Sequence, residues 1–203
     1  MKTCIIISGG DYSPIGRIAP GDFVIACDKG YDYALREGIV PQLLMGDFDS
    51  YSGALPENVP VERFKIEKDD TDTMLAIRYA AEHGFEAVRI CCALGGRLDH
   101  LFANIQSLAF AAKAGMQAQA DDENTFIRVL RPGAYQLKER KDWSLSLFSL
   151  SESCSNVCIL GAKYELQGGR LSYSFPLGVS NEFRGDVSLS FDSGLMLLIC
   201  SRK

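Results

Sequence analysis

The hydrophobic pattern changes near residue 125, and this change limits the possible folds more than any other feature. Before it, short apolar runs alternate with segments of helical spacing; after it, apolar residues recur at every second position, as in WSLSLFSLS (143–151) and DVSLSF (186–191). Apolar strands alternating with helices indicate a mostly parallel sheet with helices on both faces. Period-two alternation indicates half-buried antiparallel strands. We therefore predict an α/β domain over residues 1–125 and an all-β sandwich or barrel over residues 130–203.

The first domain divides into strand-like and helix-like segments. Glycines at positions 38, 84 and 115 follow the helical segments and predict where three helices end. In the third helix, the spacing predicts that Leu101, Ile105 and Leu108 lie on one buried face. The predicted strands are 4–8, 23–27, 43–46, 61–65, 87–94 and 116–120.

Composition excludes several classes of protein. The chain has 203 residues and is 47% hydrophobic, enough to bury a sizeable core. Its net charge is −5 and it has no Lys/Arg block, which argues against a nucleic-acid partner. The first apolar run is too short for a signal peptide or a membrane span, so we expect no membrane association and a cytoplasmic protein.

The seven cysteines lie mostly in apolar stretches, which indicates reduced thiols in the core rather than a disulfide framework. Cys154 and Cys158 have the spacing of a ligand pair. No second pair or nearby histidine completes a zinc site in the sequence, so we do not expect zinc.

Acidic or glycine-rich segments follow four of the predicted parallel strands. Ligands of such sheets bind in the crevice beyond the carboxyl ends of the strands. We therefore expect these segments to form one site. They are CDKG (27–30), GDFDS (46–50), KDDTD (68–72) and LGGRLDH (94–100).

In GDFDS, Asp47 and Asp49 are two positions apart, so in an extended segment their side chains point the same way. Two carboxylates placed like this can converge on one divalent cation that prefers oxygen ligands. Taken alone, the motif is equally typical of a turn in which one aspartate caps the following segment.

In KDDTD, Asp69 or Asp70 is well suited to cap the N-terminus of the following helix. A cap accounts for only one or two of the crowded carboxylates. Lys68 could contact a phosphate, and Asp72 could supply a further metal ligand.

In LGGRLDH, two glycines before a helix N-terminus predict an anion site, and Arg97 is a bidentate phosphate donor. Read separately, Asp99 is an N-cap and His100 an ordinary first-turn histidine. The common nucleotide motifs GxxxxGK[ST] and GxGxxG are absent from the sequence, so a nucleotide would have to bind in another way.

Taken together, these motifs resemble those of the thiamine pyrophosphokinase family in order and spacing. The resemblance rests on Asp28-Lys29-Gly30, GDFDS, KDDTDTMLA and GGRLDHLFANI, and on GAKYEL (161–166) and LGVSNEF (177–183) in the second domain. It covers nearly the whole chain, and we see no departure at a motif position.

The resemblance implies transfer of pyrophosphate from ATP to the hydroxyl of thiamine, giving thiamine diphosphate and AMP. It also implies Mg²⁺, a C-terminal β-sandwich and a homodimer with thiamine at the subunit junction. By this resemblance, Asp47, Asp49 and Asp72 bind the metal and act in catalysis. A carboxylate near the hydroxyl, Asp72 or Asp47, could accept its proton as general base. The implied ATP-site residues are Asp28, Gly30, Lys68, Asp69, Thr71, Arg97, Asp99 and His100, and the implied thiamine-site residues are Tyr164, Ser180 and Asn181.

Two alternatives remain open from the residues alone. Asp-x-Asp motifs at strand ends also serve metal-dependent nucleotide-sugar transferases, although that reading leaves the thiamine-site residues without a role. A non-catalytic thiamine or nucleotide sensor would need fewer carboxylates. Without the resemblance, Tyr164 is typical of a strand aromatic that packs in the β core, and Ser180-Asn181 of a turn.

Overall fold

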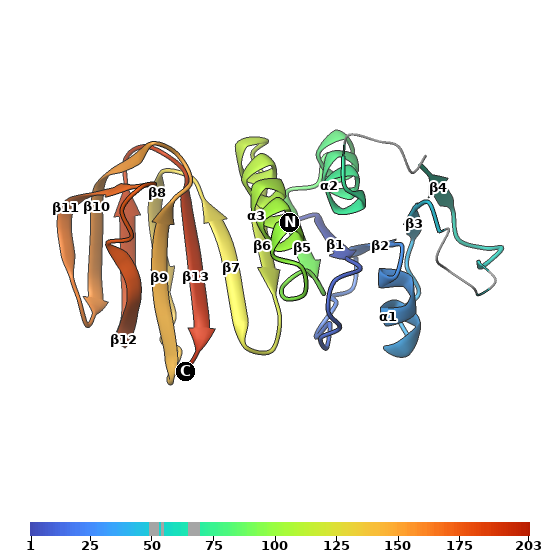
Figure 1. The fold of residues 1–203 in the computed structure, drawn as a ribbon, viewed down its shortest axis with the longest axis horizontal. Coiled ribbons are helices and arrows are strands. Elements are labelled where there is room, and N and C mark those ends of the chain that lie inside the picture. Colours follow the sequence, from blue (N-terminus) through green and yellow to red (C-terminus); the bar gives the residue numbers. More distant parts are fainter. Residues whose placement is uncertain (49–52, 54, 65–69) are drawn as a thin grey trace. The chain divides into compact units, whose positions relative to one another are not determined.

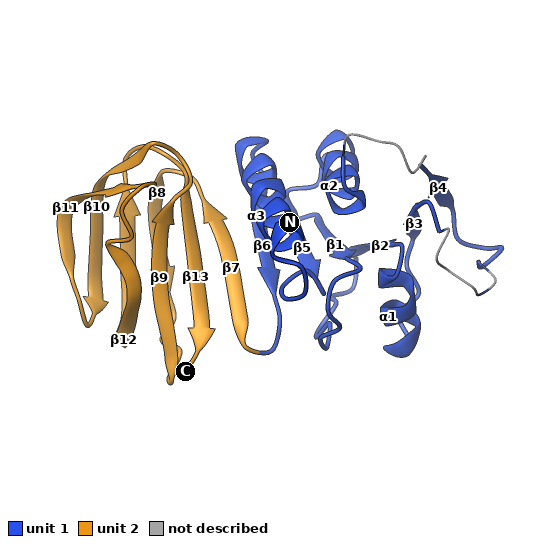
Figure 2. Ribbon diagram, in the orientation of Figure 1, with its two compact units in different colours: residues 1–123 blue, residues 124–203 orange. Residues whose placement is uncertain are grey.

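The computed structural model describes residues 1–48, 53, 55–64 and 70–203 (Figure 1). The chain divides into two compact units, residues 1–123 (unit 1) and 124–203 (unit 2), which Figure 2 shows in different colours. Three of the predicted site residues, Asp49, Lys68 and Asp69, lie outside the described residues.

The described strands of unit 1 form a parallel sheet in the order β6-β5-β1-β2-β3-β4. The predicted parallel sheet is therefore confirmed. The chain adds β2, β3 and β4 on one side of β1 and then returns to place β5 on the other side. Such a reversal is a topological switch point, where the loops after two adjacent strands separate and leave a crevice. The strands are β1 (Thr3–Ile7), β2 (Phe23–Cys27), β3 (Leu43–Gly46), β4 (Val61–Arg63), β5 (Ala87–Cys91) and β6 (Gln117–Asp121).

The helices of unit 1 connect these strands and lie on both faces of the sheet (Figure 1). They are α1 (Gly30–Arg36), α2 (Asp72–Glu82) and α3 (Leu98–Lys113). Helix α1 connects β2 to β3, and α2 connects β4 to β5. These two connections run in opposite directions along the sheet, so right-handed crossovers place α1 and α2 on opposite faces. Helices α2 and α3 pack against each other on the other face. The predicted stops are confirmed: Gly38, Gly84 and Gly115 each follow a helix with positive φ, at 66°, 69° and 97°.

The predicted buried face of α3 is only partly correct. Leu108 is buried, whereas Leu101 and Ile105 are half-buried, and the face includes the polar residues Asn104 and Ser107. Asn104 Nδ2 donates to the carbonyl of Ala93 at 2.9 Å, and Ser107 Oγ donates to the carbonyl of Ala103 at 2.8 Å. Because their polar atoms have hydrogen-bond partners, Asn104 and Ser107 can be buried. The buried face of α3 therefore differs from the purely apolar face that the spacing predicts.

Unit 2 consists of antiparallel strands, and its long strand β12 belongs to two sheets. Residues 178–182 of β12 pair with β9, whereas residues 183–191 pair with β10 and β8. One sheet is β7-β13-β9-β12 and the other is β11-β10-β12-β8. The strands are β7 (Thr125–Leu130), β8 (Gly133–Leu137), β9 (Trp143–Ser149), β10 (Ser153–Ala162), β11 (Leu166–Ser172), β12 (Gly178–Phe191) and β13 (Met196–Arg202).

The two sheets of unit 2 enclose one hydrophobic core. Leu145 and Leu147 from β9 meet Val157 from β10 and Leu189 from β12 in this core. In β9, Leu145, Leu147 and Ser149 are buried, whereas Ser146 and Phe148 between them are half-buried, which confirms the predicted period-two alternation. Trp143 packs on the edge of the core, as expected for a structural residue. Of the two predicted alternatives, a sandwich or a barrel, this arrangement is a sandwich.

Two further expectations concern the cysteines and membranes. All seven cysteines are free thiols, and six are buried, as predicted from their apolar surroundings. Within the described part of the chain, no helix combines the length and the apolar character needed to cross a membrane.

Candidate active site

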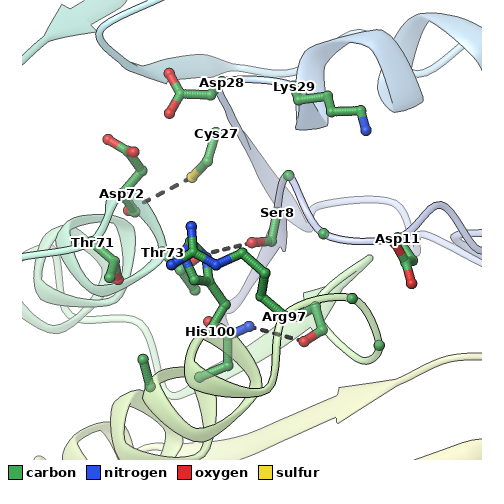
Figure 3. A pocket seen from close by; sticks show the side chains of 17 residues that line it. Ser8, Asp11, Cys27, Asp28, Lys29, Thr71, Asp72, Thr73, Arg97 and His100 are labelled. Carbon is green, nitrogen blue, oxygen red and sulfur yellow. Dashed lines mark hydrogen bonds between the residues drawn. The ribbon is translucent and has the colours of Figure 1, made fainter. Parts of the chain in front are cut away.

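A pocket of about 380 Å³ lies at the carboxyl ends of β1, β2 and β5, beside the first turns of α2 and α3 (Figure 3). This is the switch point between β1 and β5, where the fold favours ligand binding. Five of the predicted site residues line the pocket. They are Asp28, Thr71, Asp72, Arg97 and His100.

Asp28 is held at the edge of the pocket by the loop that follows β3. Its carboxyl lies where a β-carbon at position 46 would be, and Gly46 has a φ of 150°. Asp28 Oδ1 accepts a hydrogen bond from Phe48 N at 3.3 Å, and Asp28 N donates to the Met45 carbonyl at 3.1 Å. Asp28 and Phe48 both have positive φ, at 44° and 54°. Left-handed backbone at two non-glycine residues marks strain of the kind that clusters at functional sites.

The carboxyl groups of Asp28 and Asp72 lie on the same side of the pocket (Figure 3). Burial, the hydrogen bond with Asp72 and the charges of Asp72 and Asp47 together raise the pKa of Asp28 to about 7, and burial is the largest cause. Near neutral pH the Asp28 carboxyl is therefore often protonated. A divalent cation bound by these two carboxylates would relieve the same repulsion, because such cations prefer oxygen ligands.

Asp47 follows β3 directly and is half-buried, but it is not among the residues that line the pocket. Its charge still acts on Asp28, as the raised pKa of Asp28 indicates. Among the described residues, no group of three acidic, histidine or cysteine side chains is arranged to hold a metal ion. Asp49, the predicted partner of Asp47, lies outside them.

The start of α2 differs from the prediction at its cap. Thr71 is the N-cap, and its Oγ1 accepts a hydrogen bond from Met74 N at 3.2 Å. Asp70 is not the cap, because its carboxylate pairs with Arg78 Nε at 2.8 Å. Asp69, the other predicted cap, lies outside the described residues. The Thr71 cap places Asp72 in the first turn of α2, facing the pocket.

Two buried hydroxyl groups fix this turn to the sheet. Ser8 Oγ, at the end of β1, lies 2.7 Å from Thr73 Oγ1 in α2. Both side chains also line the pocket. Cys27 Sγ approaches the carbonyl of Asp72 at 3.7 Å from the end of β2. The position of Asp72 therefore depends on contacts from two neighbouring strands.

Arg97 and Asp99 form a bidentate ion pair at the start of α3. Arg97 Nη2 and Nε donate to the two oxygens of Asp99 at 2.6 and 3.1 Å. The Arg97 guanidinium lowers the pKa of Asp99, which also accepts from His100 N at 2.9 Å. Asp99 is thus not the predicted N-cap, because Arg97 occupies that position and has no capping side-chain bond. Both side chains are mostly exposed, so Arg97 can exchange this partner for a phosphate.

Gly30 and Asp99 do not line the pocket. A β-carbon at Gly30 would overlap the carbonyl oxygen of Ile7, so glycine here lets α1 begin against the end of β1. Gly30 thus contributes to the site through packing.

The sequence prediction missed residues 8–11 (SGGD), which follow β1 and line the pocket. Gly10 N donates to the carbonyl of Cys92 at 2.9 Å, and a β-carbon at Gly10 would lie 2.6 Å from that oxygen. The other segments were identified because ligands bind beyond the carboxyl ends of parallel strands, and the same reasoning applies to this segment. Lys29 is a second omission. It lines the pocket but extends away from the carboxyls of Asp28 and Asp72 (Figure 3).

Unit 2 has its own pocket, of about 140 Å³, which Tyr164, Glu165 and Asn181 line together with apolar side chains. Tyr164 lies in the turn between β10 and β11 and is 63% exposed, so it does not pack in the β core. Asn181 is 7% exposed and hydrogen-bonds the backbone of Tyr164. Ser180 is exposed and lies outside the pocket lining, with a φ of 58°.

The two units match two domains of one protein family. Residues 18–120 match "Thiamin pyrophosphokinase, catalytic domain", and residues 135–196 match "Thiamin pyrophosphokinase, vitamin B1 binding domain". The chain is thus a transferase with a catalytic part followed by a vitamin-binding part. It belongs to the thiamine pyrophosphokinase family, as its resemblance to that family implied.

Full-length relatives agree with this assignment. The thiamine pyrophosphokinase of Bacillus subtilis (strain 168) is 31% identical to this chain over 99% of each. A crystal structure of the enzyme from Bacillus subtilis has a TM-score of 0.92 at 28% identity and covers 100% of both chains. That of Geobacillus thermodenitrificans has a TM-score of 0.85 at 27% identity, covering 100% of this chain and 98% of that one.

Proposed function

We propose that this protein transfers the pyrophosphoryl group of ATP to the hydroxyl of thiamine, with Mg²⁺, giving thiamine diphosphate and AMP. The observation that carries the proposal is the convergence of Asp28 and Asp72 in a pocket that Lys29, Arg97 and His100 also line. Carboxylates for a cation together with cationic donors for phosphates are the groups that phosphoryl-transfer sites require.

We propose that Asp47, Asp49 and Asp72, the predicted ligands, bind Mg²⁺, with the carboxyl of Asp28 beside that of Asp72. The raised pKa of Asp28 supports the fit: after burial, its causes are the hydrogen bond with Asp72 and the charges of Asp72 and Asp47, and a bound cation would offset that repulsion. Bound Mg²⁺ would neutralise phosphate charge as the transferred group passes between oxygens.

The remaining pocket residues suit the nucleotide and its phosphates. Arg97 can form two parallel hydrogen bonds to a phosphate once it leaves Asp99. Lys29 and His100 add donors, and the backbone of the 8–11 segment gives close access because Gly9 and Gly10 carry no side chain. Thr71 lines the same pocket, and the predicted contacts of Lys68 and Asp69 remain part of the proposal.

The reaction proceeds by in-line attack of the thiamine hydroxyl oxygen on the β-phosphorus of ATP. A new O–P bond forms as the bond from the β-phosphorus to the bridging α,β oxygen breaks, and AMP leaves with that oxygen. Asp72 is the favoured acceptor of the hydroxyl proton, because it lines the pocket and Asp47 does not. Arg97 and Lys29 hold the phosphates in line.

We assign thiamine to the pocket of unit 2. The exposed ring of Tyr164 offers a π face to the cationic thiazolium, and Glu165 in the same lining offers a negative charge. The apolar side chains of Leu166, Leu171 and Leu177 suit the flat rings. Ser180 and Asn181 are the other thiamine-site residues that the resemblance implies.

We further propose a cytoplasmic homodimer. Exposed apolar side chains within residues 164–179 of unit 2 support an interface, because monomers rarely expose large apolar patches to water. They include Tyr164, Tyr173, Phe175, Leu177 and Val179. Seven free thiols support a reducing compartment. Sedimentation measurements across a dilution series, with parallel assays, test the dimer: specific activity should fall as the protein dissociates.

One assay separates the proposed function from its alternatives. The protein is incubated with ATP, Mg²⁺ and thiamine, and AMP and thiamine diphosphate are followed together. Their equimolar appearance, abolished by EDTA, is the expected result. Thiamine binding without AMP would indicate a sensor, and inertness toward thiamine would leave the nucleotide-sugar transferase.

A further inference from the structure

We infer that Asn181 contributes to thiamine binding as a positioning residue, by fixing the backbone of Tyr164. The inference rests on the proposed function for its ligand, but its structural part can be measured without any ligand. It assigns Asn181 a different role from the direct thiamine contact that the family resemblance implies.

The side-chain amide of Asn181 hydrogen-bonds both the backbone N–H and the backbone C=O of Tyr164. Asn181 Oδ1 accepts from Tyr164 N at 2.9 Å, and Asn181 Nδ2 donates to the Tyr164 carbonyl at 2.7 Å. The same Oδ1 accepts from Glu182 N at 2.9 Å. An amide oxygen has two lone pairs and an amide nitrogen two hydrogens. Three of these four positions are therefore used inside the protein.

These bonds extend the pairing of β10 with β12 past the point where the strands diverge. Ala162 pairs with Phe183, and Lys163 N donates to the Glu182 carbonyl at 2.9 Å. At the next position the side chain of Asn181 replaces a backbone partner. The turn that carries Tyr164 is thus attached to β12 by an amide that imitates a peptide group.

Tyr164 needs such an attachment because its own side chain is poorly held. The ring is 63% exposed, and its described ring contact is Lys163 Nζ, 5.5 Å from the centroid. Asn181, by contrast, is buried, so its hydrogen bonds are shielded from water and are costly to leave unmade. A fixed backbone keeps the ring over the pocket before the ligand arrives, which reduces the entropy lost on binding.

Two variants and their combination test this role in the full-length protein. Thiamine affinity is measured by calorimetry for Asn181→Ala, Tyr164→Ala and the double variant. If Asn181 acts through Tyr164, each single change should weaken binding by about tenfold, and the double variant should be little worse than Tyr164→Ala. Additive losses would mean that Asn181 contacts thiamine independently, and would overturn the inference.

Hydrogen exchange of residues 160–166 in the ligand-free protein gives the second readout. Asn181→Ala should speed exchange in this segment, whereas Ser149→Ala should not. Ser149 is the matched control, because it is a buried polar residue of the same unit whose hydroxyl bonds the Ser151 carbonyl at 2.8 Å, and it does not line the pocket.

The two readouts separate this inference from the proposed function. Unchanged exchange in Asn181→Ala would overturn the inference whatever the protein binds. Faster exchange with unchanged thiamine affinity would overturn the positioning role while leaving the enzyme assignment intact. A wild-type protein that does not bind thiamine would refute the proposed function, and with it the ligand of this site.

Discussion

The carboxyl of Asp28 lies over Gly46 in the space that any larger residue would fill with its β-carbon. This contact joins the loop after β2 to the loop after β3, and it is reinforced by the hydrogen bond from Phe48 N to Asp28 Oδ1. Gly46 therefore determines where a carboxylate of the other loop can lie. The relationship explains why a glycine precedes the acidic pair in the GDFDS motif.

Gly46→Ala should displace Asp28 and lower kcat by about 100-fold, because small misplacements of catalytic groups have effects of this size. Overpacking should also reduce stability by about 1–3 kcal/mol. Steady-state kinetics and thermal unfolding measure the two effects. Gly38→Ala is the control: Gly38 also has positive φ, at 66°, but nothing lies within 4 Å of its added β-carbon. It should lose stability and keep its activity; equal kcat in both variants would contradict the prediction.

Asp72→Asn should lower kcat by about 10²–10⁴-fold, because it removes the proposed proton acceptor and weakens a metal ligand. Asp70→Asn is a control two residues away. Asp70 pairs with Arg78 near the surface, and losing such a pair changes stability by no more than about 1 kcal/mol. Kinetics over a range of Mg²⁺ concentrations separates the roles of Asp72. Near-normal turnover of Asp72→Asn with normal Mg²⁺ binding would exclude Asp72 as the base.

Asp28→Asn should stabilise the metal-free protein at pH 8 more than at pH 5. The folded-state pKa of Asp28 is raised to about 7, so its protonated form is favoured by folding. That stability is fully present below the ordinary value of 3.8 and is lost as the pH rises through about 7. Discounted for partial exposure, the difference is about 1 kcal/mol, or about 2–4 °C in Tm.

The measurement is thermal unfolding in EDTA at both pH values, for the variant and the wild type. Asp186→Asn provides the comparison, because Lys138 lowers the pKa of the exposed Asp186. Asp186 therefore stays ionised from pH 5 to pH 8, and its variant should show the same Tm difference from wild type at both. A larger gain for Asp28→Asn at pH 5 would contradict the assigned direction.

Ser8→Ala and Thr73→Val should each reduce stability by about 1–3 kcal/mol, because each leaves the other buried hydroxyl without its partner. The double variant should lose less than the sum, with a coupling energy of about 1–2 kcal/mol. Urea denaturation of the four proteins completes the cycle. Strict additivity would show that the two hydroxyls do not act as a pair.

The sequence was sufficient to predict most of the architecture. Each described parallel strand of unit 1 begins within two residues of its predicted first residue. A continuous apolar run between polar segments is typical of a buried parallel strand, so its start can be located from the sequence. The expectation that ligands bind beyond the carboxyl ends of parallel strands also led to Asp28, Asp72 and Arg97, which line one pocket. These features depend on local pattern and on a general property of parallel sheets.

The details that could not be predicted depend on contacts between residues far apart in the sequence. Asp70 is a good cap by propensity, but Arg78 competes for its carboxylate and Thr71 takes the cap. The pairing of Asp28 with Asp72 requires the order of strands and the backbone of Gly46, neither of which is visible in a motif. The hydrogen bonds of Asn181 require the register of β12 against β10.

Because β12 belongs to two sheets, the fold of unit 2 constrains the number of residues in this strand more strongly than it constrains which residues they are. A single inserted residue would shift its pairing with β9, β10 or β8 and turn core side chains such as Val187 and Leu189 toward solvent. The same shift would carry Asn181 away from Tyr164. Insertions and deletions during divergence should therefore collect in the turns of unit 2, while β12 keeps its number of residues even as its sequence drifts.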